Sequence, residues 1–496
     1  MQSVPFRNRY VQLGKEFSVE TRPEPVENPE LIKFNYSLAK KLGLLDTCFN
    51  PDHDLPEATA IFSGNRPPVG AEPLSMVYAG HQFGYFNPQL GDGRAILIGE
   101  VETTDARTYG IQLKGSGQTV FSRNGDGRAA LGPVLREYLL SEAMSGLGVP
   151  TTRALAVVAT GEQVAREQLL PGGIITRVAS SFVRVGTFQY FSAQDDLPAI
   201  KKLADFVIEH NYPEVQSAEN MYIALFESVV ERQAVLVAKW MHSGFIHGVM
   251  NTDNMSIAGE TIDYGPCAFM DSFNHDQVFS SIDRDRRYAY SNQPSIGLWN
   301  LTRLAETLVP LLAEEASAGV EIAQDILKGY ITRYQQNWLD GMRDKLGLLV
   351  PDENDKALID ELLDIMSENR ADFTLTFYYL SQLNIVPDEQ DSSLLKLFEK
   401  SDQPVQWLAK WRRRVEQESL GDEVRQCKMQ SVNPVYIPRN HQVEAAIRAA
   451  EDNGDFSVFH DLHEVLQKPF ERQPGKDEYM LAPEPGEVVR HTFCGT

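Results

Sequence analysis

The sequence predicts an α+β protein with two lobes, a β-rich lobe in its first part and a mostly helical lobe behind it. From about residue 75 to 190, short β-rich runs alternate with turn residues. Beyond residue 200 the apolar residues recur with helical spacing instead. A length of 496 residues, of which 42% are hydrophobic, is ample for a sizeable core. We therefore expect a cleft between the two lobes.

The first lobe is expected to be a set of short strands with one helix. About sixty residues rich in Pro and Glu come first, and they predict irregular structure with short helices. One helix is predicted near Pro133–Leu147, because proline suits a first helical turn and Gly146 suits its end. The predicted strands are Ala95–Val101, Tyr109–Lys114, Ala154–Ala159 and Ile174–Val178.

The second lobe is expected to be helical. Between Met221 and Met241, apolar residues such as Leu225, Val229 and Trp240 fall near one helical face. Further helices are predicted at 300–316, 321–346, 355–370 and 390–418. We divide the chain into a β-rich lobe with its N-terminal extension (1–195), a helical lobe (196–430) and a C-terminal extension and tail (431–496).

The charge excludes two classes of partner. The chain has 46 Lys and Arg against 69 Asp and Glu, which gives a net charge of −23. Nucleic acids and anionic membranes are bound through Lys and Arg, so neither is expected as a partner. No stretch of 18 apolar residues and no hydrophobic leader is visible, and the four cysteines are far apart in sequence. We expect a soluble, cytoplasmic protein.

The negative charge is unevenly distributed. Residues 101–200 contain nine acidic and nine basic residues, whereas residues 201–400 contain 32 acidic and 16 basic residues. An anionic ligand is therefore best tolerated in the neutral segment.

The strongest chemical motif extends from Phe245 to Gly265. We expect Met255–Ile257 and Thr261–Asp263 to be two strands of a hairpin, whose open end brings Asn254 and Asp263 together. A carboxylate, an amide oxygen and ligand phosphates form the oxygen set that Mg²⁺ takes. Asp253 is a candidate base for a hydroxyl. The alternative is that these residues only cap turns.

A second motif is a strand lysine followed by a helix glutamate. Alternation in Tyr109–Lys114 places Gln112 and Lys114 on one face of the strand and the apolar residues on the other. Glu137 follows 23 residues later, in the predicted helix. Such a pair holds a phosphate-binding ammonium group in kinase-like sites. Taken alone, the pair also fits an exposed lysine and a solvated glutamate.

Other candidate phosphate-binding residues are glycines and arginines. The stretches Gly91–Arg94 and Asn124–Arg128 allow close approach of backbone N–H groups to phosphates, but they also suit ordinary hairpin turns. Arg177 and Arg184 fall on β-like segments and suit a polyphosphate, unless surface acids pair with them. No P-loop motif is present. We interpret His247 as a structural residue that holds its loop.

Two sets of motifs resemble known proteins. His247-Gly-Val249, followed after four residues by Asn254, resembles the kinase catalytic loop, and Asp263-Tyr-Gly265 resembles its D-F-G motif. Val249 stands where kinases have the catalytic aspartate, so Asp253 is the substitute. The chain is identified as similar to the selenoprotein O (YdiU) family by the strings Tyr78–Gly84, Gln89–Arg94, Gln112–Thr119 and Arg123–Ala129.

The resemblance implies a protein-kinase-like bilobal fold that binds ATP in an inverted orientation. It implies metal-dependent transfer of AMP to Ser, Thr or Tyr hydroxyls of proteins, with UTP and UMP as an open alternative. Asn254 and Asp263 would ligate Mg²⁺ or Mn²⁺, and Asp253 would be the base. The nucleotide site would comprise Gly91, Gly93, Arg94, Lys114, Asp126, Gly127, Glu137, Arg177, Arg184 and Asp263.

Two other functions stay open at this point. One is a conventional protein phosphotransferase, and the other is an inactive, ATP-binding pseudokinase scaffold. The tail leaves a further question, because some members have selenocysteine third from the C-terminus and this chain has Cys494 there. Cys494 could form a redox switch with Cys267, or it could be a plain exposed thiol.

Overall fold

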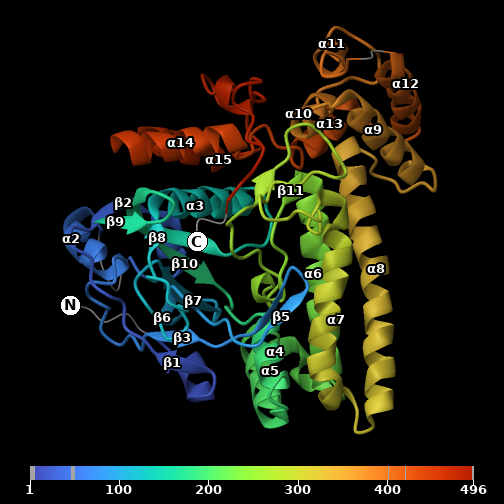
Figure 1. The fold of residues 1–496 in the computed structure, drawn as a ribbon. Coiled ribbons are helices and arrows are strands. Elements are labelled where there is room, and N and C mark those ends of the chain that lie inside the picture. The colour runs from blue at the N-terminus through green and yellow to red at the C-terminus, as the bar shows by residue number, and fades with distance from the viewer. Residues whose placement is uncertain (1–5, 46–50, 400–401, 419, 494–496) are drawn as a thin grey trace.

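The core of the first part is one antiparallel sheet, seen in a computed structural model that describes residues 6–45, 51–399, 402–418 and 420–493 (Figure 1). Within these residues the sheet has eight strands. Their order is β1 (Ser18–Glu20), β3 (Leu74–Met76), β6 (Ala95–Glu102), β7 (Thr108–Lys114), β10 (Leu169–Ala179), β9 (Arg153–Ala165) and β2 (Glu30–Phe34), and β8 (Ala129–Ala130) pairs with β10.

The sequence predicted the centre of this sheet and missed its edges. In β7, Ile111 and Leu113 are buried in the apolar core while Lys114 faces the other way, as the alternation predicts. The prediction of irregular structure for the first sixty residues was wrong in part, because β1 and β2 form both edges of the sheet. The predicted strands at 154–159 and 174–178 are the inner portions of the longer strands β9 and β10.

One long helix and two C-terminal helices cover one face of the sheet. Helix α3 (Leu131–Gly146) confirms the predicted helix and packs against β9 and β10. Helices α14 (Asn440–Asn453) and α15 (Ser457–Leu466) lie over α3, although about 300 residues separate them in sequence (Figure 1). Helices α1 (Tyr36–Lys41) and α2 (Pro51–Phe62) contact β9 elsewhere on the sheet.

The second part of the chain is built on three long helices that run side by side (Figure 1). They are α6 (Met221–Ser243), α7 (Gln293–Leu312) and α8 (Ala316–Leu346), and α4 (Val185–Ser192) and α5 (Leu197–Asn211) pack against α7. On α6, Leu225 and Val229 are buried, as the helical spacing predicts. The result is a β-sheet region followed by a helical region, an arrangement compatible with two lobes.

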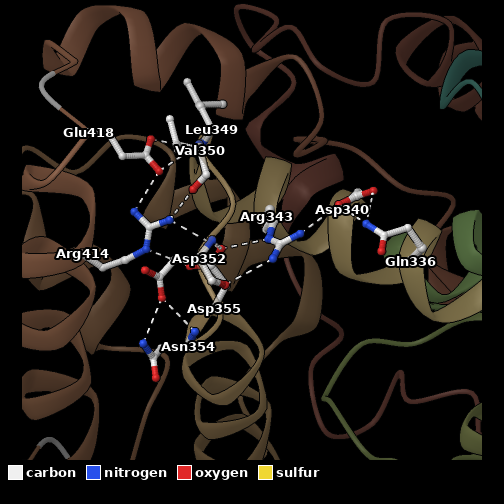
Figure 2. A network of polar contacts seen from close by, with 10 residues as sticks. All are labelled: Gln336, Asp340, Arg343, Leu349, Val350, Asp352, Asn354, Asp355, Arg414 and Glu418. Carbon is white, nitrogen blue, oxygen red and sulfur yellow. Dashed lines mark hydrogen bonds and ion pairs between the residues drawn. The ribbon is translucent and has the colours of Figure 1, made fainter.

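The helices after α8 form a separate cluster at the end of the bundle. They are α9 (Asp355–Asn369), α10 (Phe373–Leu380), α11 (Asp391–Leu395), α12 (Asp402–Glu416) and α13 (Asp422–Gln430). The prediction of one helix over 390–418 was wrong, because α11 ends at Leu395 and α12 begins separately, with Pro404 in its first turn. Figure 2 shows how buried Asp355 joins three helices by bonding Arg343 of α8 and Arg414 of α12.

Short elements connect these layers. Two small strand pairs are β4 (Gly80–Gln82) with β5 (Tyr85–Asn87), and β11 (Phe245–Ile246) with β12 (Ala268–Phe269). The 3-10 turns are η1 (Tyr10–Leu13), η2 (Pro213–Ser217), η3 (Thr252–Asn254), η4 (Tyr290–Asn292) and η5 (Asp477–Met480). No helix within the described part of the chain is both long and apolar enough to cross a membrane.

Candidate active site

The predicted site residues gather around one cavity of about 850 Å³. Its wall combines the sheet with the segment that follows α6. Eleven of the twelve predicted residues line it: Gly91, Gly93, Arg94, Lys114, Asp126, Gly127, Arg177, Arg184, Asp253, Asn254 and Asp263. The twelfth, Glu137 of α3, lies behind the wall and is bonded to two of the others.

Glu137 holds two cations that come from neighbouring strands. Lys114 Nζ of β7 donates to Glu137 Oε2 at 2.7 Å, and Arg177 Nε of β10 donates to Oε1. These strands are adjacent in the sheet, and α3 packs across it, so the three side chains converge. Burial alone would raise the pKa of Glu137, but Arg177 and Lys114 outweigh it, and the net direction is downward. The predicted lysine–glutamate pair is thus present and is extended by Arg177.

Asp263 connects this group to Arg184. Its Oδ2 accepts from Arg184 Nη1 at 2.8 Å, its Oδ1 accepts from Arg177, and Lys114 Nζ lies 3.7 Å away. Burial opposes ionisation, yet the three cations bring the pKa of Asp263 well below its usual range. Its φ of 65° is left-handed, a conformation that non-glycine residues adopt at a cost. Asp263 is therefore an ionised carboxylate fixed in the cavity wall.

The segment around Asn254 and Asp263 is not the hairpin that the sequence predicted. Ser256 pairs with Arg184 and Thr261 pairs with Thr151, so each expected strand finds a distant partner instead of the other. Both Asn254 and Asp263 still face the cavity. Arg184 also differs from the prediction, because it lies outside the sheet, as the extended residue immediately before α4.

Asp253 is a buried carboxylate at the cavity, 6% exposed. Gln82 Nε2 donates to its Oδ2 at 3.1 Å, while its Oδ1 has no hydrogen-bond partner among the described residues. Burial raises the pKa of Asp253 to about 6, against the opposing effect of the Gln82 hydrogen bond. A carboxylate with one unpartnered oxygen and a raised pKa can accept a proton from a bound hydroxyl.

The small hairpin of β4 and β5 fixes the loop that carries Asp253. His81 N donates to Thr252 Oγ1 at 2.6 Å, and Phe83 N donates to Asn251 Oδ1 at 3.1 Å. Gly80 is required for this contact, because a Cβ there would lie 2.5 Å from Asp253 Oδ1. Gln82 is thus one of several contacts that orient the loop.

The glycines form a tight edge of the cavity. Gly91 and Gly127 have φ of 68° and 66°, and a Cβ on Gly127 would lie 2.0 Å from the oxygen of Gly117. Asp126 is half-exposed at the outer end, where Arg166 Nη1 donates to it at 2.8 Å. Glycine is therefore required at both positions by close contacts within the cavity wall, with Phe121 for Gly91 and with Gly117 for Gly127.

The stretch whose sequence resembles the kinase catalytic loop contains His247 and Val249. His247 is buried and its Nε2 contacts the oxygen of Ile262 at 2.9 Å, which confirms its structural role. Val249, at the position of the kinase aspartate, lines the cavity without an ionisable group.

Sequence reasoning missed three residues that support the cations. Asp92 is buried, accepts from Gln112 Nε2 at 3.3 Å and lies 3.9 Å from Arg184, while Tyr78 lies under the Arg184 guanidinium at 4.7 Å. Burial raises the pKa of Asp92 to about 6, although Arg184 opposes the shift. All three residues stand within or beside the quoted family strings, but their spacing alone gave no sign of these long-range contacts.

Only one cysteine of the predicted redox pair, Cys267, lies among the described residues. Cys267 is buried, and its Sγ contacts the oxygen of Tyr264 at 3.4 Å. Cys494 lies outside the described residues. The pairing of these cysteines stays a prediction.

Comparison with known proteins identifies the family of this chain. The family model described as "Protein adenylyltransferase SelO" matches residues 1–467. The chain is 55% identical to "Protein nucleotidyltransferase YdiU" of Rhizobium meliloti (strain 1021) over the full length of both chains. It is 56% identical to the protein of the same name from Rhodopseudomonas palustris (strain BisB5), over 99% of each chain. The chain therefore belongs to the SelO family of protein adenylyltransferases, which are enzymes of the nucleotidyltransferase type.

Proposed function

We propose that this protein transfers AMP from ATP to Ser, Thr or Tyr hydroxyls of other proteins. The observation that carries the proposal is one cavity that combines two buried arginines and the partly buried Lys114 with a buried carboxylate, Asp253. Val249 stands at the position of the kinase base. Family membership supports the same reaction class. A protein-kinase-like arrangement of the two parts belongs to this proposal.

The cations bind the phosphates. Lys114 and Arg177 come from the neighbouring strands β7 and β10, and Arg184 immediately precedes α4. Glu137 and Asp263 hold the three cations in position before any ligand arrives. A preorganised group of cations stabilises the charge that develops on the pyrophosphate leaving group. The glycine edge with Gly91, Gly93 and Gly127, together with Arg94 and Asp126, contacts the rest of the nucleotide.

The residues present fit a divalent metal ion. Asn254 Nδ2 donates to the oxygen of Val249 at 3.0 Å, so its Oδ1 is the atom oriented to accept a cation. With ionised Asp263, the donors are an amide oxygen and a carboxylate, which together with phosphate oxygens suit Mg²⁺ or Mn²⁺. When bound, the metal neutralises charge on the phosphates.

Asp253 accepts the proton of the incoming hydroxyl. The hydroxyl oxygen forms a bond to the α-phosphorus of ATP, the bond from that phosphorus to the bridging oxygen breaks, and pyrophosphate leaves. The proton passes to the carboxylate of Asp253, which lines the cavity.

Isotopically labelled ATP tests the proposal directly. We expect label from the α-phosphate, and none from the γ-phosphate, to remain on protein after incubation with Mg²⁺ and the enzyme. Asp253→Asn should lower this incorporation by at least about 100-fold, the scale of a lost general base. Incorporation of γ-label alone would indicate a phosphotransferase, and binding of ATP without either label would indicate a scaffold.

A further inference from the structure

The hairpin that holds the Asp253 loop has a second, outward surface. Its tip exposes Tyr85, which is 83% exposed, and Phe86, which is 42% exposed. Close by, Ile282 is 58% exposed and lines the same cavity as Phe83 of the hairpin. Large apolar side chains that are exposed beside a cavity-lining segment are typical of a surface that binds another protein.

Two arginines and a tryptophan lie next to this tip. The guanidinium carbons of Arg287 and Arg303 lie 4.7 Å and 5.2 Å from the centre of the Trp299 ring. The His81 ring packs on the same tryptophan at 5.3 Å and on Phe86 at 4.8 Å. This stack therefore continues directly into the hairpin.

Arg287 has cationic hydrogen-bond donors that nothing in the described chain satisfies. Its Nε and Nη2 have no hydrogen-bond partner among the described residues. The nearby carboxylate of Asp283 is bonded to the backbone N of Arg287 and not to its guanidinium. The backbone continues into Tyr288, whose hydroxyl donates to Asn251 Oδ1 at 2.6 Å, two residues before Asp253. An arginine whose guanidinium packs on aromatic rings, with no carboxylate of the described chain paired to it, thus lies beside the loop of the proposed base.

We propose that the hairpin tip and the Arg287–Trp299–Arg303 stack form the docking surface for the protein substrate. The segment that they bind is a loop or terminus with a carboxylate side chain a few residues from the acceptor hydroxyl. This inference rests on the proposed function and adds to it the kind of substrate.

The charge of Arg287 and the buried position of Asp253 indicate which kind of substrate segment binds this surface. A carboxylate side chain is the group that pairs with the partly exposed Arg287, whose guanidinium forms no ion pair among the described residues, through charge-assisted hydrogen bonds. Because Asp253 is buried in the cavity, a hydroxyl on a flat folded surface cannot reach it, whereas one on a loop or terminus can. Tyr, Trp and Arg side chains are also those that dominate binding in protein interfaces.

Peptides test the surface. Each peptide contains one Ser, Thr or Tyr as the acceptor. A Glu, Gln or Lys is placed at one flanking position, and this position is varied across the peptide series. The measured quantity is the transfer of label from α-labelled ATP to the peptide. We expect the wild-type enzyme to prefer Glu over Gln about tenfold in kcat/KM at the best position, the scale of one charged hydrogen bond. Arg287→Gln should remove this preference by raising KM for the Glu peptide.

A charge reversal separates recognition from structural damage. Arg287→Glu should prefer the Lys peptide over the Glu peptide, a gain that misfolding cannot produce. Arg333→Gln is the matched control, because Arg333 pairs with Glu231 on the α6–α8 side and should leave the wild-type preference unchanged. Two outcomes overturn the docking surface but not the proposed function. They are equal labelling of the Glu, Gln and Lys peptides by the wild-type enzyme, and a preference for the Glu peptide that the Arg287 variants retain. Absence of α-label from every peptide and protein overturns the proposed function as well.

Discussion

At the scale of single residues, Glu137 is the carboxylate that a buried arginine and a partly buried lysine share. Glu137→Gln keeps the shape of the side chain and removes its charge, so Lys114 and Arg177 lose their common counter-ion. Breaking a buried ion pair costs about 3 kcal/mol or more. We expect the kcat/KM of AMP transfer to fall by at least about 100-fold, because the lost ion pair displaces Lys114 and Arg177, the proposed phosphate-binding groups. Steady-state kinetics and thermal unfolding measure the two effects.

Glu142 is the matched control on the same helix. It is also buried, and it accepts from Arg153 Nε at 2.8 Å and from Ala154 N at 2.9 Å, outside the cavity. Glu142→Gln should lower stability comparably while the folded enzyme keeps its kcat/KM. If both variants lose activity in proportion to stability, Glu137 has no separate role in the site.

Lys345 gives a pH-dependent prediction away from the cavity. It is buried near Phe377, with its Nζ 4.3 Å from the ring centre, and burial lowers its pKa to about 7. The unfolded chain binds this proton up to a pKa of about 10.4, so between pH 7 and that value stability rises with pH. Below pH 7 the full cost of burying the charge is present.

Lys345→Met removes this cost. We expect the variant to unfold at a higher denaturant concentration at pH 7.5, by about 2 kcal/mol or more, because each unit of lowered pKa is worth about 1.4 kcal/mol. The advantage should shrink toward pH 10. Urea unfolding of both proteins at four pH values measures it, and an advantage that is constant with pH would contradict the assignment.

At the scale of elements, the β4–β5 hairpin orients the proposed base. Gly80→Ala places a Cβ 2.5 Å from Asp253 Oδ1 and 2.9 Å from its Cβ, so either the hairpin or the carboxylate must shift. Small displacements of a catalytic group are costly, so we expect kcat to fall at least about tenfold. The nucleotide dissociation constant, measured by calorimetry, should change less than kcat. Gly486→Ala, where the added Cβ meets nothing within 4 Å, should change neither value.

What the sequence could predict depended on whether the partners of an element are local. The centres of β7 and α3 followed from alternation and helix-end signals, and Lys114 and Glu137 followed with them. The loop after Asn254 was predicted wrongly because its pairing partners, Thr151 and Arg184, lie far away in sequence. Asp92 was missed for the same reason. The boundaries at residues 195 and 430 stay predictions.

At the scale of the whole molecule, a net charge of −23 coexists with a cationic cavity. Lys114, Arg177 and Arg184 all come from the electrically neutral segment 101–200, while Asp253, Asn254 and Asp263 come from the acidic part. The cavity joins the two segments. An acidic protein therefore concentrates a few fixed cations in one cavity, without the extended basic surface that a polymer of phosphates requires.

The C-terminal extension completes the fold around the site helix. Glu451 of α14 accepts from Gly132 N at 2.8 Å, at the start of α3, where the residue before the helix is Ala130 and has no capping side chain. A carboxylate at a helix N-terminus satisfies an unpaired N–H and interacts favourably with the helix dipole. The end of the chain thus stabilises the helix that carries Glu137.

Glu451→Ala should therefore act at a distance on the site. We expect a loss of about 1 kcal/mol in unfolding free energy, the usual value of a cap, and a KM for ATP that is raised more than kcat is lowered. Glu444→Ala is the control on the same helix, because Glu444 also pairs with Arg448 but is half-exposed and should change stability by less than about 0.5 kcal/mol. Chemical unfolding and ATP kinetics decide the outcome. Equal effects of both variants would show that loss of the Arg448 pairing, and not the cap on α3, is the cause.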